Sequence, residues 1–359
     1  MTPKERLLAA IVGKEVDRIP WSPFLAYYWE SLPIHEKEKG QIAFLQEIGA
    51  DPLLRGFHQL FEIKRKKCIV SEIIKGNERE VKYETPVGTI SEKYVYSKAG
   101  FTWFITEHPV KREDDFKVLT YINEDMKLER NISKFIEDYN TLGDNGLYLP
   151  IIGTEMKSSF QSLVEHWVGT EELVYALADY PKVVEECLQV MKKNSIQSVN
   201  ISVKSPAEGF IFWEDSSTTN ISPTYFKEYI APEINEWGKI IHNNDKYLIH
   251  HACGHINALI DYMSKTEIDM IESISPPPTG NIELWDARAR LPDNIGLIGG
   301  IEPGVFLNST MDELEEYVIT LLQKMSNRHY ILANSDSCPP GVDIEKFRKI
   351  TKLAKQYHY

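Results

Sequence analysis

The stretch YLIHHACGHINALIDYMSKTEIDMIESIS, residues 247–275, decides the fold class. It starts with a short apolar run at 247–251, continues with apolar residues at helical spacing over 256–264, and ends in a second apolar run at 270–273. This order is typical of two parallel strands joined by a helix. We therefore expect an α/β protein.

The same alternation extends along the chain from residue 147 onward. The expected strands cover residues 148–152, 209–213, 247–251, 270–273, 295–299 and 330–333, and the expected helices cover 183–204, 223–242, 256–264, 282–291, 311–325 and 343–356. With an earlier strand at 51–57, the repeat favours a (βα)8 TIM barrel over a doubly wound sheet. No glycine-rich phosphate-binding fingerprint follows any of these strands. We expect one barrel domain over residues 1–359.

Two segments differ from this repeat. Thr2, Pro3 and Glu5 combine a capping box with a proline at the first helical position, which predicts an N-terminal helix that ends at Gly13. Residues 64–106 are rich in β-forming side chains, with turn signals at 76–77 and 86–88. We expect this segment to be an antiparallel β insertion.

Charge and composition limit the function classes. The chain has 359 residues with 40 Lys and Arg against 53 Asp and Glu, a net charge of −13, which argues against a nucleic-acid partner. The N-terminal apolar stretch is too short for export, and no stretch is long enough for a membrane span. Four scattered cysteines are too few for a disulfide framework, so we expect reduced thiols and a cytoplasmic location.

Reactive side chains fall at the carboxyl ends of four expected strands, where a βα barrel carries its functional residues. Glu214 follows the strand at 209–213, and Glu272 lies in the strand at 270–273. His251 and Cys253 form a His-x-Cys pair, and Cys338 follows the last strand. One His and two Cys leave a position of tetrahedral zinc open, as in catalytic zinc sites. The alternative is that both cysteines are small core residues and His251 is a buried, hydrogen-bonded histidine.

These residues resemble the uroporphyrinogen decarboxylase superfamily, and within it the zinc-dependent methyltransferases that act with corrinoid proteins. The similarity covers nearly the whole chain. It rests on TPKER (2–6) with DRIP (17–20), on GTEEL (169–173) with YP (180–181), and on HACG (251–254), GGIEP (299–303) and CPPG (338–341). In the methyltransferase branch, the His, the Cys after it and the late Cys bind zinc. The resemblance therefore implies that His251, Cys253 and Cys338 are the zinc ligands.

The segment WSPFLAYYW, residues 21–29, separates the two branches. Decarboxylases of this superfamily carry arginine there to bind porphyrinogen carboxylates, and this segment contains none. We expect a zinc-dependent enzyme that moves a methyl group between a small molecule and the cobalamin of a separate corrinoid protein. Glu214 is the candidate fourth ligand or proton handler, and Glu272 is a weaker candidate for proton transfer.

The aromatic side chains of this segment have two interpretations. Trp21, Phe24 and Tyr28 can fill the barrel core, or they can form a wall for a flat methoxylated ring or a cage for a methylated ammonium. On the second interpretation we expect a methoxylated aromatic donor.

Three alternatives stay open. They are a uroporphyrinogen-decarboxylase-like enzyme, a methyltransferase from a methylated corrinoid to a thiol of the coenzyme M type or to tetrahydrofolate, and a non-catalytic tetrapyrrole carrier. A separate corrinoid protein is expected because the chain shows no second βα domain with a cobalt-binding histidine motif. For self-association, we consider a homodimer.

Overall fold

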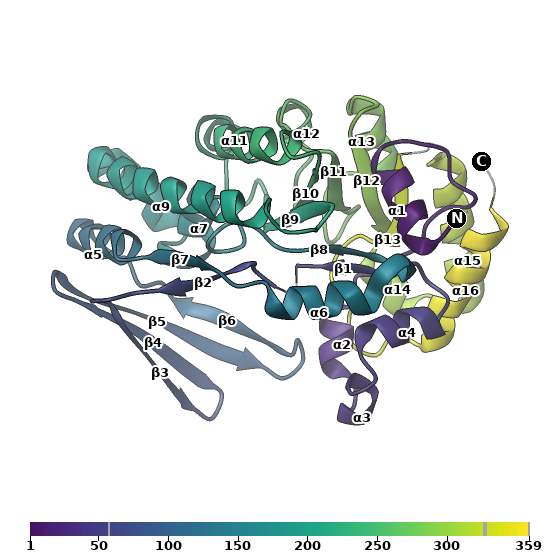
Figure 1. Ribbon diagram of the computed structural model, residues 1–359, viewed down its shortest axis with the longest axis horizontal. Helices are drawn as coiled ribbons and strands as arrows, with labels where there is room; N and C mark the ends of the chain where they lie inside the picture. Colours follow the sequence, from purple (N-terminus) through teal and green to yellow (C-terminus); the bar gives the residue numbers. More distant parts are fainter. Residues whose placement is uncertain (57, 326–328, 358–359) are drawn as a thin grey trace.

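The computed structural model describes residues 1–56, 58–325 and 329–357 and shows an α/β protein with a region of parallel strands (Figure 1). The parallel strands in chain order are β1 (Leu53–Arg55), β8 (Leu147–Leu149), β9 (Gly209–Glu214), β10 (Tyr247–Ala252), β11 (Met270–Ile274), β12 (Gly296–Ile301) and β13 (Tyr330–Asn334). Strands β9 to β13 pair in chain order as a five-stranded sheet, and β1 pairs with β8. The early strand is shorter than the predicted 51–57, of which Phe57 lies outside the described residues.

Backbone contacts outside the named strands link these two sheets. Ile151, just after β8, makes a parallel bridge to Ile211 of β9. Trp21 makes a parallel bridge to Leu332 of β13, and the backbone N–H of Asp51 donates to the carbonyl of Trp21 at 2.7 Å. Each edge of the five-stranded sheet therefore has a neighbouring segment.

The strands alternate between two cores, as the two-residue period of a strand requires. One set of side chains packs toward helix α1 (Pro3–Ile11), and its members are Leu53, Leu147, Leu149, Ile211, Ile249, Met270, Ile298, Ile331 and Ala333. The alternate set, which includes Phe210, Phe212, Leu248 and Ile271, belongs to the larger core shared with the other helices. Both faces of the strands are thus buried.

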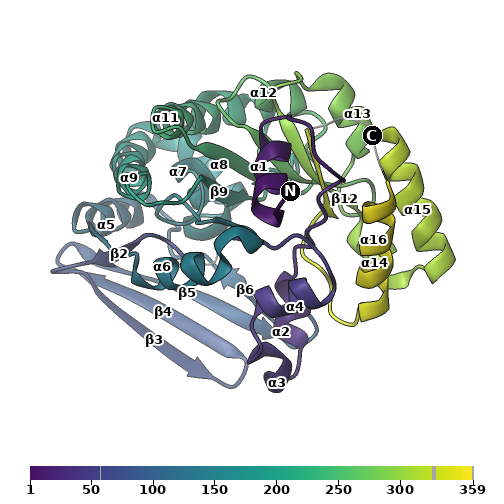
Figure 2. The same ribbon diagram turned by 45° about the vertical axis from the view of Figure 1, so that its right-hand side comes forward.

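Helices α9, α11, α13 and α15 lie around the outside of these strands (Figure 2). The helices that follow α1 are, in chain order, α2 (Ala26–Ser31), α3 (Ile34–Lys37), α4 (Gln41–Glu47), α5 (Glu113–Glu124), α6 (Ser133–Leu142), α7 (Ser159–Ser162), α8 (Thr170–Asp179), α9 (Pro181–Ser202), α10 (Pro223–Tyr225), α11 (Ala231–His242), α12 (Ile260–Met263), α13 (Leu284–Arg290), α14 (Pro303–Asn308), α15 (Met311–Lys324) and α16 (Ile344–Gln356). Short η segments are η1 (Gly143–Asn145) and the π-helical η2 (Leu163–Trp167) and η3 (Phe226–Ile230). Among the described residues, no helix combines the length and apolar character needed to cross a bilayer.

Two predicted helices differ from the observed ones. The helix expected over 223–242 is divided by the π-helical turn η3, and the helix expected over 256–264 is reduced to α12. Ahead of α12, tight turns replace helical hydrogen bonds, because Leu259 donates to Ile256 at 2.8 Å and Ile256 to Gly254 at 3.1 Å. Apolar spacing alone does not show these breaks.

A four-stranded antiparallel sheet occupies the lower left of Figure 1, away from α15 and α16. Its strands are β3 (Ile69–Lys75), β4 (Glu78–Thr85), β5 (Gly88–Ser97) and β6 (Thr102–Glu107). The short pair β2 (Phe61–Lys64) and β7 (Lys127–Arg130) connects it to the parallel region. Its inner face packs on the body through Tyr83, whose ring lies 5.4 Å from that of Trp167 in η2. The sheet covers residues 69–107, so it begins inside the β-rich segment 64–106 expected from the sequence and ends one residue beyond it.

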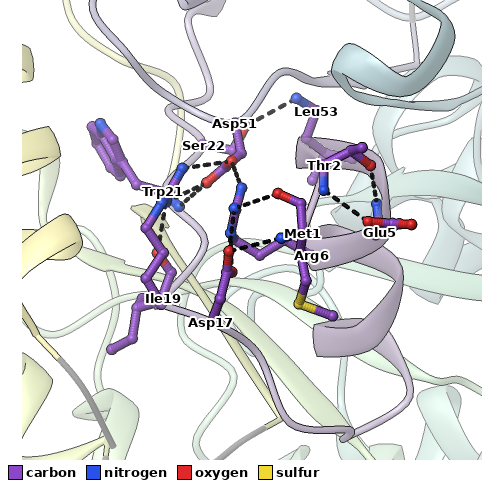
Figure 3. Close-up of polar contacts among 11 residues, drawn as sticks. Met1, Thr2, Glu5, Arg6, Asp17, Ile19, Trp21, Ser22, Asp51 and Leu53 are labelled. Carbon is purple, nitrogen blue, oxygen red and sulfur yellow. Dashed lines mark hydrogen bonds and ion pairs between the residues drawn. The ribbon is translucent and has the colours of Figure 1, made fainter.

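A buried carboxylate fastens the N-terminal helix to the first parallel strand (Figure 3). Asp51, with no exposed surface, accepts hydrogen bonds from Arg6 at 2.6 Å and from Arg18 at 2.8 Å. The backbone N–H of Trp21 donates to the same carboxylate at 3.1 Å. Helix α1 begins with the predicted capping box of Thr2 and Glu5. The guanidinium groups of Arg6 and Arg18 therefore serve as counter-ions of Asp51.

Candidate functional site

A cavity of about 580 Å³ opens at the carboxyl ends of the parallel strands. Its lining combines carboxylates, aromatic rings, one lysine and one thiol, and consists of Phe24, Ala26, Tyr27, Lys157, Glu165, Trp213, Glu214, Asp215, His251, Cys253, Thr279, Pro303, Asp336 and Ser337. The register of β9, β10 and β11 explains this gathering, since His251 pairs with Trp213 on one side and Glu272 on the other. Three of the predicted catalytic and metal-binding residues, Glu214, His251 and Cys253, thus line one cavity.

Glu272 fixes the orientation of His251. Its Oε2 lies 2.9 Å from Nδ1 of His251, and its other oxygen accepts a hydrogen bond from Nε of Arg55. Burial acts to raise the pKa of Glu272, but the charge of Arg55 and the His251 hydrogen bond outweigh it and lower the pKa. An ionised carboxylate can only accept, so Nδ1 of His251 carries the proton and Nε2 is available toward the cavity.

Cys253 follows β10 at a sharp turn. Its backbone N–H donates to the carbonyl of Glu214 at 3.2 Å, and Gly254 after it has φ of +88°. A Cβ at Gly254 would lie 2.5 Å from that of Ser217, so only glycine fits there. Burial raises the pKa of the Cys253 thiol well above its ordinary value, and the charges of Asp336 and Asp215 add to this. The thiolate would need a cation beside it.

Glu214 is buried at the floor of the cavity. Its Oε1 accepts a hydrogen bond from the backbone N–H of Ser158 at 2.9 Å, while its Oε2 has no hydrogen-bond partner. His250 lies beside it, with Nε2 3.4 Å from Oε2. Burial would raise the pKa of Glu214, but His250 and the Ser158 hydrogen bond lower it. Among the described residues, this oxygen of an ionised, buried carboxylate therefore has only the His250 imidazole beside it and no closer donor.

One wall of the cavity carries excess negative charge. Glu165 is paired with Lys157 and also accepts the backbone N–H of Asp215 at 2.9 Å. Among the described residues, Asp215 forms no ion pair with a lysine or arginine, and its pKa is raised by burial and by the charge of Glu165. Asp336 lies 4.0 Å from Nε2 of His251, and its charge also acts on the Cys253 thiol. Lys157 alone faces these carboxylates in the lining of the cavity.

Three aromatic rings, those of Phe24, Tyr27 and Trp213, also line the cavity. The ring of Phe24 lies 5.5 Å from that of His251 and 5.9 Å from that of Trp213. Gly56 makes room for Trp213, because a Cβ there would meet the indole at 2.6 Å. Tyr27 is 39% exposed and lies near Thr102 of the antiparallel sheet, which acts on the pKa of its hydroxyl. The β5–β6 hairpin therefore reaches the mouth of the cavity.

Two of the predicted substrate residues do not line this cavity. Trp21 has no exposed surface and packs edge-on against Phe306, with centroids 6.5 Å apart. Tyr28 packs between Phe44 and Phe347 at 5.7 and 5.0 Å. Both side chains occupy the core, the other interpretation of the aromatic run: Trp21 lies beside β13 through its bridge to Leu332, and Tyr28 is in α2. Only Phe24 of the predicted wall faces the cavity.

Cys338 is also placed apart from His251 and Cys253. It is fully buried in the main core and does not line the cavity, although Ser337 before it does. Its backbone N–H donates to Phe24 at 3.0 Å, and its carbonyl accepts from Tyr28 at 2.8 Å. Over the described residues, no three His, Cys, Asp or Glu side chains are arranged to hold a metal ion. His251 and Cys253 offer two donors of the kind zinc prefers, and the third is not in place.

Sequence reasoning missed several residues of the site. Arg55 ends β1 and Asp336 follows β13, so the rule that selected Glu214 and His251 would have found both had it been applied to every strand. Asn334 ends β13 and clamps the aromatic segment: its Oδ1 accepts from the N–H of Phe24 at 2.8 Å and its Nδ2 donates to the Phe24 carbonyl at 2.9 Å. No local pattern predicts this last contact, which joins residues 310 positions apart.

Comparison with known families agrees with this architecture. The uroporphyrinogen decarboxylase (URO-D) family matches residues 105–357, more than two thirds of the chain. The chain belongs to the uroporphyrinogen decarboxylase family. This confirms the superfamily suggested by the sequence motifs, and the fold class as α/β.

Individual members of the URO-D family are distant from this chain. A uroporphyrinogen decarboxylase of Prochlorococcus marinus (strain CCMP1986 / NIES-2087 / MED4) is 25% identical over 248 residues, covering 68% of this chain and 64% of the relative. The chloroplastic enzyme of Nicotiana tabacum is 25% identical over 182 residues, covering 50% and 44%. The matches span 39% to 64% of the length of these curated relatives.

A solved structure covers the chain more completely. A methyltransferase from Methanosarcina mazei has a TM-score of 0.63 and 14% sequence identity, covering 99% of this chain and 98% of its own. At this identity the likeness concerns the fold. This chain therefore resembles decarboxylases of the URO-D family in sequence and a protein described as a methyltransferase in fold.

Proposed function

We propose that this chain is a zinc-dependent methyltransferase that moves a methyl group between a small molecule and the cobalamin of a separate corrinoid protein. One observation carries the proposal: His251 and Cys253 open into one cavity, and Glu272 holds the imidazole with Nε2 available. The methyltransferase fold neighbour supports it. The acidic lining supports a cation bound there.

His251, Cys253 and Cys338 are the proposed zinc ligands. The third requires the segment 336–338 to turn its thiol from the core toward the cavity, where Asp336 and Ser337 already face. When bound, zinc supplies a Lewis acid that stabilises charge on the atom that carries or receives the methyl group. Glu214 is the proposed proton handler or fourth ligand, because it lines the same cavity and its Oε2 accepts no hydrogen bond from the described residues. Glu272 positions His251 and has no oxygen left for the substrate.

The proposal includes a closed (βα)8 barrel as the single domain that carries this site. All seven named parallel strands contribute side chains to the inner core beneath α1. The bridges of Trp21 to β13 and of Ile151 to β9 support an eighth segment at residue 21 that joins β13 to β1. Closure would bring the late strand end at Cys338 next to the first strand.

A corrinoid partner would approach the mouth of the cavity. Exposed apolar side chains border it: Tyr27 itself, Phe101, which precedes the Thr102 that lies near Tyr27, and Met156, whose carbonyl accepts the N–H of Trp213 at 2.8 Å. Such a rim is suited to the apolar edge of a corrin or of the protein that carries it.

We propose a wider class of methyl donors and acceptors than the methoxylated aromatic expected from the sequence. Phe24, Tyr27 and Trp213 provide aromatic surface for such a ring. A thiol of the coenzyme M type or tetrahydrofolate as methyl acceptor is the alternative in the same reaction class.

A decarboxylase acting on a carboxylate-rich tetrapyrrole is the second candidate, favoured by the names of the curated relatives. The charges in the cavity oppose it. Arg55 is paired with Glu272, Arg6 and Arg18 with Asp51, and Lys157 with Glu165. Acetate and propionate groups would face carboxylates in place of counter-ions.

The test is a visible-absorption assay with zinc-loaded protein and free cob(I)alamin, scanned over aryl methyl ethers, methanol, methylamines and methylated thiols. We expect at least one methyl compound to convert cob(I)alamin to its methylated form, and the Cys253→Ala variant to lose this activity. Turnover of uroporphyrinogen III by metal-free protein, with no methyl transfer from any donor, would contradict the proposal.

A further inference from the structure

We propose that the small-molecule partner of this site is an organic cation, with an ammonium group held between the carboxylates and the aromatic rings of the cavity. This inference rests on the proposed methyl-transfer function for the reaction, but its evidence is the charge and shape of the cavity. The methyl-exchanging end of the molecule would point toward His251 and Cys253.

The charge balance of the cavity lining is negative. Glu165 is neutralised by Lys157, whereas Asp215 and Asp336 form no ion pair with a lysine or arginine of the lining, and Asp336 has only the His251 imidazole near it, at 4.0 Å. The charges of the two aspartates act on each other and on the Cys253 thiol. An anionic ligand would be repelled by this pair, and a neutral ligand would leave their charges uncompensated.

The carboxylates are held by contacts that leave room for a ligand. Asp215 accepts the side chain of Asn220 at 2.7 Å and the N–H of Ser217 at 3.2 Å, and neither donor carries a charge. The Asp336 side chain accepts the N–H of Ser337 at 2.6 Å and is 27% exposed. Glu214, which is 1% exposed and lines the cavity, adds an oxygen without a hydrogen-bond partner.

The aromatic rings suit a cation better than a second flat ring. Phe24 and Trp213 are tilted by 56° to each other, so they form an angled corner instead of two parallel faces. Tyr27, which is partly exposed, adds a third ring to the lining. Ring faces directed from several sides around one volume, next to carboxylates, are the arrangement that recognises alkylammonium groups.

Direct binding to metal-free protein tests the inference independently of methyl transfer. The probes are choline and its uncharged isostere 3,3-dimethylbutan-1-ol, with 4-methoxybenzoate as an anionic aryl methyl ether, measured by calorimetry at constant ionic strength. We expect choline to bind about tenfold or more tightly than the isostere, and 4-methoxybenzoate not to bind. Equal affinity for choline and the isostere, or preferred binding of 4-methoxybenzoate, would overturn the inference.

Variants locate the binding. Trp213→Leu and Asp336→Asn should each weaken choline about fivefold or more while leaving the isostere unchanged. Asp312→Asn, an exposed aspartate on α15, is the matched control and should bind choline like the wild type. Asp336 is in a partly exposed loop, so its variant is expected to fold, which thermal melting checks. Choline binding that survives both cavity substitutions would place the cation elsewhere and contradict the inference, whether or not the enzyme transfers methyl groups.

Discussion

The imidazole of His251 and the carboxylate of Glu272 face each other across strands β10 and β11, with Nδ1 and Oε2 2.9 Å apart. Arg55 holds the other oxygen of Glu272, so the carboxylate has one orientation. The pair determines which imidazole nitrogen is directed to the cavity. A histidine prepared in this way is what a metal ligand requires.

The first prediction concerns this pair. Glu272→Gln should lower zinc affinity about 10- to 100-fold, because the imidazole loses its charged acceptor and its fixed tautomer. The measurement is zinc competition against a chromophoric chelator. Glu233→Gln is the control, since it replaces another fully buried glutamate that does not contact His251. Wild-type zinc affinity in Glu272→Gln would show that the pair has no role in metal binding.

The second prediction concerns pH and Glu233. Burial raises its pKa to about 7, although hydrogen bonds from Ser195 and Ser159 act in the opposite direction. The folded state thus binds a proton that the unfolded state releases near its ordinary pKa, and this contribution to stability is lost as pH rises toward 7. Urea unfolding at pH 5 and pH 7.5 should show wild type losing stability relative to Glu233→Gln, by on the order of 3 kcal/mol. A difference that does not change with pH would show that Glu233 is ionised throughout.

The third prediction concerns the N-terminal ion pairs. Asp51→Asn should lower the free energy of unfolding by about 3–5 kcal/mol, because it leaves Arg6 and Arg18 without their buried counter-charge. Denaturant titration measures this. Asp17→Asn should cost much less, since Asp17 is partly exposed and contacts only Arg6 and the N-terminal amine. An equal loss of unfolding free energy in the two variants would show that the burial of Asp51 does not increase the cost of removing its charge.

The parallel strands followed closely from local patterns. The strand expected at 209–213 is β9, and the one expected at 330–333 is β13, each longer by one residue. Their apolar runs are buried on both faces, as is typical of strands in a parallel sheet. The break before α12 could not be predicted, because it depends on backbone turns around Gly254 and not on the apolar spacing of Ile256 and Leu259.

The site was predictable where one strand end decides it. Glu214, His251 and Cys253 face the cavity because each is at or directly beyond the end of a strand. Trp21 and Tyr28 were assigned from residue type alone, and the structure buries Trp21 beside β13 and Tyr28 in α2. Cys338 is two residues beyond the cavity-lining Asp336, and contacts with Phe24 and Tyr28, distant in sequence, determine where its thiol points.

The fourth prediction concerns Cys338. Cys338→Val keeps an apolar side chain of similar size in the core, so the metal-free protein should lose less than about 1.5 kcal/mol of stability. Cys338→Ser should cost about 1–3 kcal/mol through a buried hydroxyl. Both variants should bind zinc more weakly, as measured by chelator competition. Unchanged zinc affinity in Cys338→Val would remove Cys338 from the ligand set.

The most direct test of the central claim is the zinc content of the purified, dialysed protein measured by mass spectrometry. The proposed site predicts about one zinc per chain, lost in Cys253→Ser and retained in Cys68→Ser, which alters a buried thiol of the antiparallel sheet region. A wild-type protein that binds no zinc when the metal is supplied, or a Cys253→Ser variant that keeps it, would contradict the account.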